Sequence, residues 1–262
     1  MSYTFTEDTS VLYRWIRDEV ELESTIKRGK RGIAARRVQE WLSLNGFSLV
    51  IDGDYGRVTE MTVAEFQHYN GLNETGEVND ATWRVFVRRM MDVLRRPNEV
   101  PDRFDAAMLK AAERHLAVHP RETGGQNMGP WVRLYMKGNE GHSWPWCAGF
   151  TTFLMEQASE ITGKNMPMEG SFSCDWLAAN AKAKGTLVPE HDAGPNTVPP
   201  GSLFLVRRTS TDWTHTGLVV EAGRDLFKTI EGNTNDEGSR EGYEVCARRR
   251  GYGSKDFIIF PE

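Results

Sequence analysis

The hydrophobic pattern of this chain changes from helical to extended near Pro199, and that change constrains the fold more than any other feature. Before Pro199, apolar residues recur at helical spacing, as in segments 31–44 and 59–69. After it come short runs rich in β-branched and aromatic residues, each bounded by Gly, Pro or Asn: SLFLVRR, HTGLVVEAG, LFKTIEG and DFIIF. Helices followed by closely spaced strands predict an α+β fold with an antiparallel sheet.

A proline-containing segment divides the chain. Residues 95–102 read RRPNEVPD, with two prolines and little apolar content, which is typical of a domain junction. We therefore expect a small helical domain at residues 1–96 and a second domain at residues 97–262. The first should contain three helices: residues 31–44, a helix from Thr59, and a helix capped by Asn79 or Asp80.

Composition excludes several classes of protein. A formal net charge of -5 argues against a nucleic-acid binder. No apolar stretch approaches the roughly 18 to 20 residues of a membrane span, and the N-terminus lacks the pattern of a secretory signal. Three cysteines are too few for a disulfide scaffold. We therefore expect a soluble monomer that folds in the cytoplasm with at least one free thiol.

An ordered set of short motifs marks the N-terminal part. These motifs are Val38-Gln39, the DGDYG loop at 52–56, Phe66-Gln67, Gly71-Leu72 and Thr82-Trp83. In this order they resemble the peptidoglycan-binding domain found attached to wall hydrolases, over about residues 28–90. The resemblance implies a three-helix fold that holds wall glycan or stem peptide without catalysis. Asp52 and Asp54 should shape a turn, because the loop lacks the further acidic positions of a calcium-binding EF-hand.

Cys147 is the candidate nucleophile. It follows Trp-Pro-Trp at 144–146 and precedes the apolar-periodic run AGFTTFLMEQA, so it should lie at a helix N-terminus. That position lowers a thiol pKa and directs backbone N–H groups at a developing oxyanion. Cys174 and Cys246 lack such a context, and we expect buried thiols there.

The candidate base is His215, which lies in the extended run DWTHTGLVV. Alternation places His215 and Gly217 on one face, and the glycine leaves room for approaching groups. A third group should accept the other imidazole N–H. Glu231 and Asn233 are two residues apart, so an extended strand would direct both to one face, and either could orient the base.

Four blocks follow one another within about residues 105–260: WPWCAGFTTFLMEQA, PPGSLFLV, DWTHTGLVVE and TIEGNTN. In this order they are similar to the CHAP family, the cysteine, histidine-dependent amidohydrolase/peptidase domain. The resemblance implies a papain-like fold that cleaves amide bonds in peptidoglycan, with Cys147 as nucleophile, His215 as general base and Glu231 or Asn233 as orienting group. The acidic loop of calcium-binding members is missing, so we predict no metal and no other cofactor.

Three further residues are candidates for substrate binding. Gln126 and Asn127 lie in a Gly-rich loop and could donate to the oxyanion, as polar side chains upstream of the nucleophile do in papain-like enzymes. Trp146 could line the cleft or pack in the core. The run 248–250 of three arginines should be a solvated face.

The combined features predict a peptidoglycan hydrolase that is an N-acetylmuramoyl-L-alanine amidase or an endopeptidase, since one catalytic set serves both bonds. We expect synthesis in the cytoplasm without a signal peptide and action on the cell wall or periplasm after release or delivery. A phage endolysin with a holin as partner fits this setting. The alternatives are an antibacterial toxin delivered by a secretion system, with an immunity protein, and a non-catalytic wall-binding structural protein.

Overall fold

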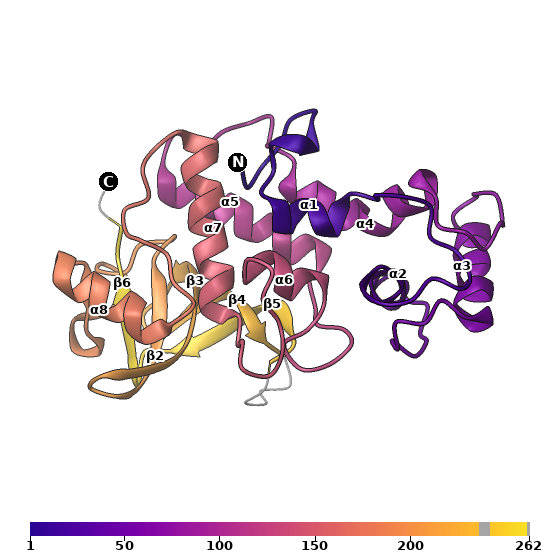
Figure 1. The fold of residues 1–262 in the computed structure, drawn as a ribbon. Helices are drawn as coiled ribbons and strands as arrows, with labels where there is room; N and C mark the ends of the chain where they lie inside the picture. Colours follow the sequence, from indigo (N-terminus) through magenta and orange to yellow (C-terminus); the bar gives the residue numbers. More distant parts are fainter. Residues whose placement is uncertain (236–241, 261–262) are drawn as a thin grey trace.

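The computed structural model describes residues 1–235 and 242–260 (Figure 1). The helices are α1 (Arg14–Val20), α2 (Ile33–Leu44), α3 (Arg57–Tyr69), α4 (Asp80–Leu94), α5 (Phe104–Val118), α6 (Pro130–Tyr135), α7 (Cys147–Thr162) and α8 (Cys174–Lys184). The strands are β1 (Leu187–Val188), β2 (Leu203–Thr209), β3 (Asp212–Ala222), β4 (Leu226–Thr234), β5 (Glu244–Gly251) and β6 (Lys255–Ile258). Among the described residues, no helix has the length and apolar character that crossing a membrane requires.

The strands form one antiparallel sheet in the order β1-β6-β2-β3-β4-β5. The α+β prediction is therefore confirmed. Helix α7 packs against β3 and β4, and α5 packs beside α7 (Figure 1). Gly232 on β4 makes this close approach possible, because a Cβ there would lie 2.7 Å from the rings of Phe150 and Trp146. Strand β4 is thereby held directly against the start of α7.

The N-terminal part contains the three predicted helices, α2, α3 and α4, at the end of the molecule away from the sheet (Figure 1). Helix α3 begins at Arg57, two residues before the expected Thr59. Asn79 caps α4 by accepting a hydrogen bond from the Thr82 N–H. Gln39 is buried and binds the DGDYG loop: it accepts from the Gly53 N–H at 2.8 Å and donates to Asp52 at 2.7 Å.

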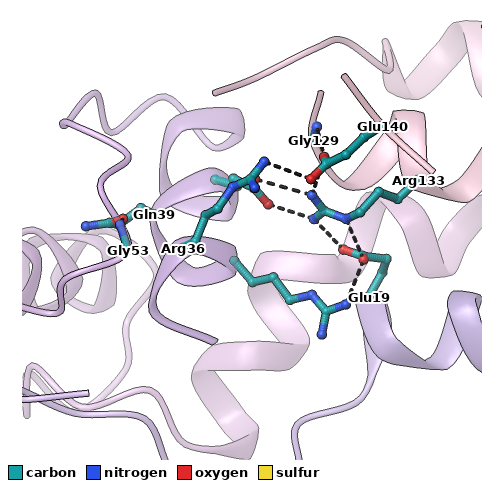
Figure 2. A network of polar contacts seen from close by, with 9 residues as sticks. Glu19, Arg36, Gln39, Gly53, Gly129, Arg133 and Glu140 are labelled. Atoms are coloured by element: carbon teal, nitrogen blue, oxygen red, sulfur yellow. Dashed lines mark hydrogen bonds and ion pairs between the residues drawn. The ribbon is translucent and has the colours of Figure 1, made fainter. Parts of the chain in front are cut away.

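A buried group of ion pairs joins the N-terminal helices to the rest of the chain. Arg133 at α6 contacts Glu19 of α1 at 2.8 Å, Glu40 of α2 at 2.7 Å and Glu140 at 2.7 Å (Figure 2). Arg133 is 4% exposed, and Glu19 and Glu40 are at most 1% exposed. Each charge in this cluster thus has an opposite partner, which offsets the cost of removing it from water.

The N-terminal segment also packs on the second half of the chain. The backbone N–H groups of Tyr3 and Thr4 donate to the carboxylate of Glu160 on α7. Sequence patterns did not predict this contact. The division at residues 96 and 97 lies in the segment between α4 and α5, and it stays a prediction.

Candidate active site

Cys147 is the first residue of α7, at the helix N-terminus that the sequence indicates. Its side chain is buried, with 5% of the residue exposed. The backbone N–H of Trp146, one residue earlier, donates to Asn233 Oδ1 at 2.8 Å. Gly149 in the first turn lets α7 approach α6, because a Cβ there would lie 2.9 Å from the Tyr135 carbonyl oxygen. These contacts fix where the helix starts and so where the thiol lies.

His215 on β3 connects Cys147 to Glu231. Nε2 of His215 lies 2.8 Å from Oε2 of Glu231, and the imidazole lies close enough to the Cys147 thiol for each group to shift the pKa of the other. Because Nε2 is occupied by Glu231, Nδ1 is the nitrogen that remains for the thiol. The His215 side chain is 17% exposed and Glu231 is fully buried. The structure therefore brings three of the predicted catalytic residues into one line of contacts.

Glu231 reaches His215 because Gly217 lies between them on β3. A Cβ at Gly217 would stand 2.7 Å from Glu231 Cγ and 2.8 Å from the Phe204 ring. The Glu231 carboxylate also accepts from Arg250 Nε at 2.6 Å and from the Thr229 hydroxyl. A buried carboxylate with so many donors stays ionised and keeps one orientation.

Asn233 does not share the face of Glu231, so that prediction is wrong. The pairing of β4 with β5 shifts register between Glu231 and Thr234, and Asn233 adopts a left-handed conformation with φ of 54°. Its side chain turns toward the start of α7, where Oδ1 accepts from Trp146 and Nδ2 donates to the Gly242 carbonyl at 2.6 Å. Asn233 thus holds the residue before Cys147.

A second thiol lies beside the first. Sγ of Cys174 is 3.9 Å from Sγ of Cys147. Cys174 is the first residue of α8, whose N-cap Ser173 accepts from the Trp176 N–H. The N-termini of two helices therefore meet at two sulfur atoms. Cys174 is buried, as the sequence predicted, but its position next to the candidate nucleophile was not anticipated.

The electrostatics of the site favour a thiolate beside an imidazolium. The hydrogen bond from Cys174, followed by the contact with His215, holds the pKa of Cys147 well below its usual range. Burial alone would lower the pKa of His215, but hydrogen bonds with Cys147 and Glu231 outweigh burial and raise it to about 9. Burial opposes ionisation of Glu231, yet Arg250 and His215 lower the pKa of Glu231 to about 2.

The three predicted substrate-binding residues lie in different environments. Trp146 is fully buried, stacks on Tyr135 and donates from Nε1 to Glu122 at 2.8 Å, so it belongs to the core and not to the cleft. Asn127 is buried, and its amide contacts the His142 carbonyl and Asn233. Gln126 is exposed on the same loop. A role for Gln126 or Asn127 in oxyanion binding stays a prediction.

Arg250 and Cys174 are the residues that sequence reasoning missed. Arg250 belongs to a run of three arginines that reads as a solvated face, yet its guanidinium pairs with Glu231 and lies 5.2 Å from the centre of the Phe204 ring. The available signal for Cys174 was Ser173, a favoured N-cap residue immediately before it. Within residues 1–235 and 242–260, no group of three or more His, Cys, Asp or Glu side chains is arranged to hold a metal ion.

Comparison with known families concerns the N-terminal helices. Residues 31–86 match the family model of the peptidoglycan binding domain. Over these residues the chain is similar to that family. The matched span contains the motifs from Val38-Gln39 to Thr82-Trp83 and corresponds to α2, α3 and the N-terminal part of α4. It covers less than half of the chain and none of the residues around Cys147.

Two solved structures show similarity to parts of the chain. The SleB N-terminal domain is 29% identical over 26% of this chain and 93% of that chain, with a TM-score of 0.25. The Burkholderia AP3 phage endolysin is 28% identical over 40% of this chain, with a TM-score of 0.24, and the match spans 41% of the endolysin. None of the curated proteins matches the chain.

Proposed function

We propose that this chain is a peptidoglycan hydrolase of the CHAP type, with a papain-like domain at residues 97–262 and a wall-binding domain within residues 1–96. The observation that carries the proposal is the contact of His215 with both Cys147 and Glu231, in a chain that also contains a peptidoglycan-binding domain. A thiolate, an imidazolium and a buried carboxylate in this order are the groups that nucleophilic amide hydrolysis needs.

The proposed reaction is acyl transfer to Cys147. The thiolate attacks the amide carbonyl, and the free backbone N–H groups of the first turn of α7 stabilise the oxyanion. His215 gives its proton to the leaving amine, which leaves a thioester on Cys147 and a neutral imidazole. Water then attacks the thioester while His215 takes its proton, and the acid product and the thiolate–imidazolium pair result. Glu231 keeps the imidazole oriented and stabilises its charged form.

The bond cut is an amide of the wall, either the N-acetylmuramoyl-L-alanine bond or a peptide bond of the stem or cross-bridge. Digestion of purified walls, followed by labelling of new amino groups, distinguishes these bonds. An amidase frees the amino group of L-alanine, whereas an endopeptidase frees a different residue. Clearing of the wall suspension without new amino groups would contradict both assignments, and an absence of clearing would favour a structural wall-binding protein.

For the biological setting we propose a phage endolysin that reaches the wall or periplasm from the cytoplasm after a holin acts. The second candidate is a toxin delivered into a competing bacterium, for which the same two domains would serve. A holin gene beside this gene would support the first, and a gene for a tightly binding immunity protein would support the second.

A further inference from the structure

We propose that Cys174 is a resolving thiol for Cys147, so that oxidation of the nucleophile ends in a reversible Cys147–Cys174 disulfide. The identity of Cys147 as the nucleophile rests on the proposed function, but the chemistry of the pair can be measured without it. The inference starts from the 3.9 Å between the two sulfur atoms. A disulfide bond is about 2 Å long, so the sulfurs need to approach by only about 2 Å.

Both backbones that carry the thiols are anchored. The Asp175 carboxylate, next to Cys174, accepts from the Trp213 N–H at 2.6 Å and thus ties the start of α8 to β3. The Thr152 hydroxyl of α7 donates to the Ser171 carbonyl at 2.8 Å and accepts from the Ser171 N–H at 3.0 Å. The segment that leads into α8 is therefore fastened to α7. The two thiols are held together at a high effective concentration.

The two thiols differ in their protonation. Cys147 is held as a thiolate, the form that reacts with peroxides. The hydrogen bond between Cys174 and Cys147, together with burial, raises the pKa of Cys174 well above the usual range, so Cys174 remains a thiol. Oxidation of Cys147 to a neutral sulfenic acid removes the neighbouring negative charge that opposes ionisation of Cys174. The second thiol therefore becomes reactive after the first has been oxidised.

The chemical steps balance with hydrogen peroxide as the oxidant. The Cys147 thiolate attacks one peroxide oxygen, the O–O bond breaks, and hydroxide leaves, which gives the sulfenic acid. The sulfur of Cys174 then attacks the sulfur of the sulfenic acid; the S–O bond breaks, and water leaves with the Cys174 proton. A dithiol reductant restores both thiols and becomes a disulfide itself. Without Cys174, continued peroxide would take Cys147 to the irreversible sulfinic acid.

The experiment treats the reduced full-length protein with hydrogen peroxide and follows intact mass and cysteine-containing peptides. We expect the wild type to lose the mass of two hydrogen atoms and to yield a peptide that links Cys147 to Cys174. Dithiothreitol should reverse both changes. In Cys174→Ser the mass should instead rise by two oxygen atoms on Cys147, with less than about a tenth of that product reversed by dithiothreitol. The matched control Cys246→Ser should form the same disulfide as the wild type.

Two results would overturn the proposal: sulfinic acid on Cys147 at equal rates in wild type and Cys174→Ser, or a wild-type disulfide that involves Cys246. Circular dichroism checks each fold, and Cys174→Ala provides a second variant if the serine disturbs α8. Detection of the disulfide in the wild-type protein does not depend on whether either variant folds. Mass detection is independent of wall lysis, so a disulfide in a protein that never lyses walls would refute the proposed function alone. Lysis without the disulfide would refute the resolving role alone.

Discussion

The carboxylate of Glu231 lies 2.8 Å from Nε2 of His215, and no part of Glu231 is exposed to solvent. Two features of the sheet produce this contact. Gly217 has no side chain to block the path across β3, and Arg250 neutralises the carboxylate. The site is therefore a row of groups with alternating charge: the Arg250 guanidinium, the Glu231 carboxylate, the His215 imidazolium and the Cys147 thiolate.

Glu231→Gln should lower kcat by orders of magnitude, because the amide keeps part of the geometry but loses the charge that stabilises the imidazolium. It should also lower the pKa of His215. Hydrolysis of a soluble muropeptide gives kcat, and NMR titration of the imidazole gives the pKa. Asn233→Ala is the comparison: it should leave the pKa of His215 near the wild-type value, since Asn233 contacts Trp146 and not the imidazole. The reverse pattern would assign the orienting role to Asn233.

The activity should fall on the alkaline side near pH 9. His215 has its pKa raised from 6.5 to about 9, so the imidazolium and the stability it contributes are fully present below 6.5 and are lost as the pH rises through 9. On the acid side, activity should fall where the Cys147 thiolate is protonated, well below the usual thiol pKa. The dependence of kcat/KM on pH measures both limbs. An alkaline limb near 6.5 would show that the ion pair does not form.

Gly217→Ala should reduce activity strongly while the sheet still forms. The new Cβ would lie 2.7 Å from Glu231 Cγ, so the carboxylate must move away from His215. Gly194→Ala is the matched control, because a Cβ at Gly194 meets nothing within 4 Å. Muropeptide hydrolysis and thermal unfolding of both variants separate the local effect from general destabilisation. Equal activity of the two variants would show that Gly217 is not needed for the His215–Glu231 contact.

Arg133→Met should lower the free energy of unfolding by up to about 3 to 5 kcal/mol, because the buried carboxylates of Glu19 and Glu40 lose the guanidinium that they share and keep only Arg37 and Arg36 as partners. The control Arg31→Met removes a pair with Asp54 in which the Arg31 side chain is 79% exposed, and a surface pair contributes only about 0 to 1 kcal/mol. Urea denaturation measures both. Similar losses for the two variants would mean that the cluster in Figure 2 does not stabilise the fold.

Local patterns were sufficient for the elements and for part of the site. Helical periodicity located α2, α3 and α4, and the Pro-containing turn before Cys147 located the start of α7. The strand pattern identified His215 and Glu231. It failed at Asn233, because a register shift inside a strand breaks the alternation on which the inference depends. The role of Trp146 was left open by the sequence, since an aromatic residue beside a nucleophile can belong to either the core or the cleft.

Contacts between distant residues were beyond such patterns. Glu19, Glu40 and Arg133 are charged and far apart in sequence, and charged residues are usually exposed, so their burial together could not be foreseen. The consequence is practical. The sequence predicts a separate domain at residues 97–262, which should fold alone. Removal of residues 1–96, however, would remove Glu19 and Glu40, the two buried carboxylates that pair with Arg133. We therefore expect the isolated fragment to be less stable than the full chain.

The most direct test of the account is lysis of purified walls by Cys147→Ala, with the clearing rate of the suspension as the measurement. The substitution removes only the sulfur at the start of α7, so folding and sedimentation with walls should match the wild type. The control Cys246→Ser should retain most of the lytic activity. The account predicts that Cys147→Ala shows no lysis above the rate of walls without enzyme. Residual lysis within about tenfold of the wild type would contradict the assignment of Cys147 as the nucleophile.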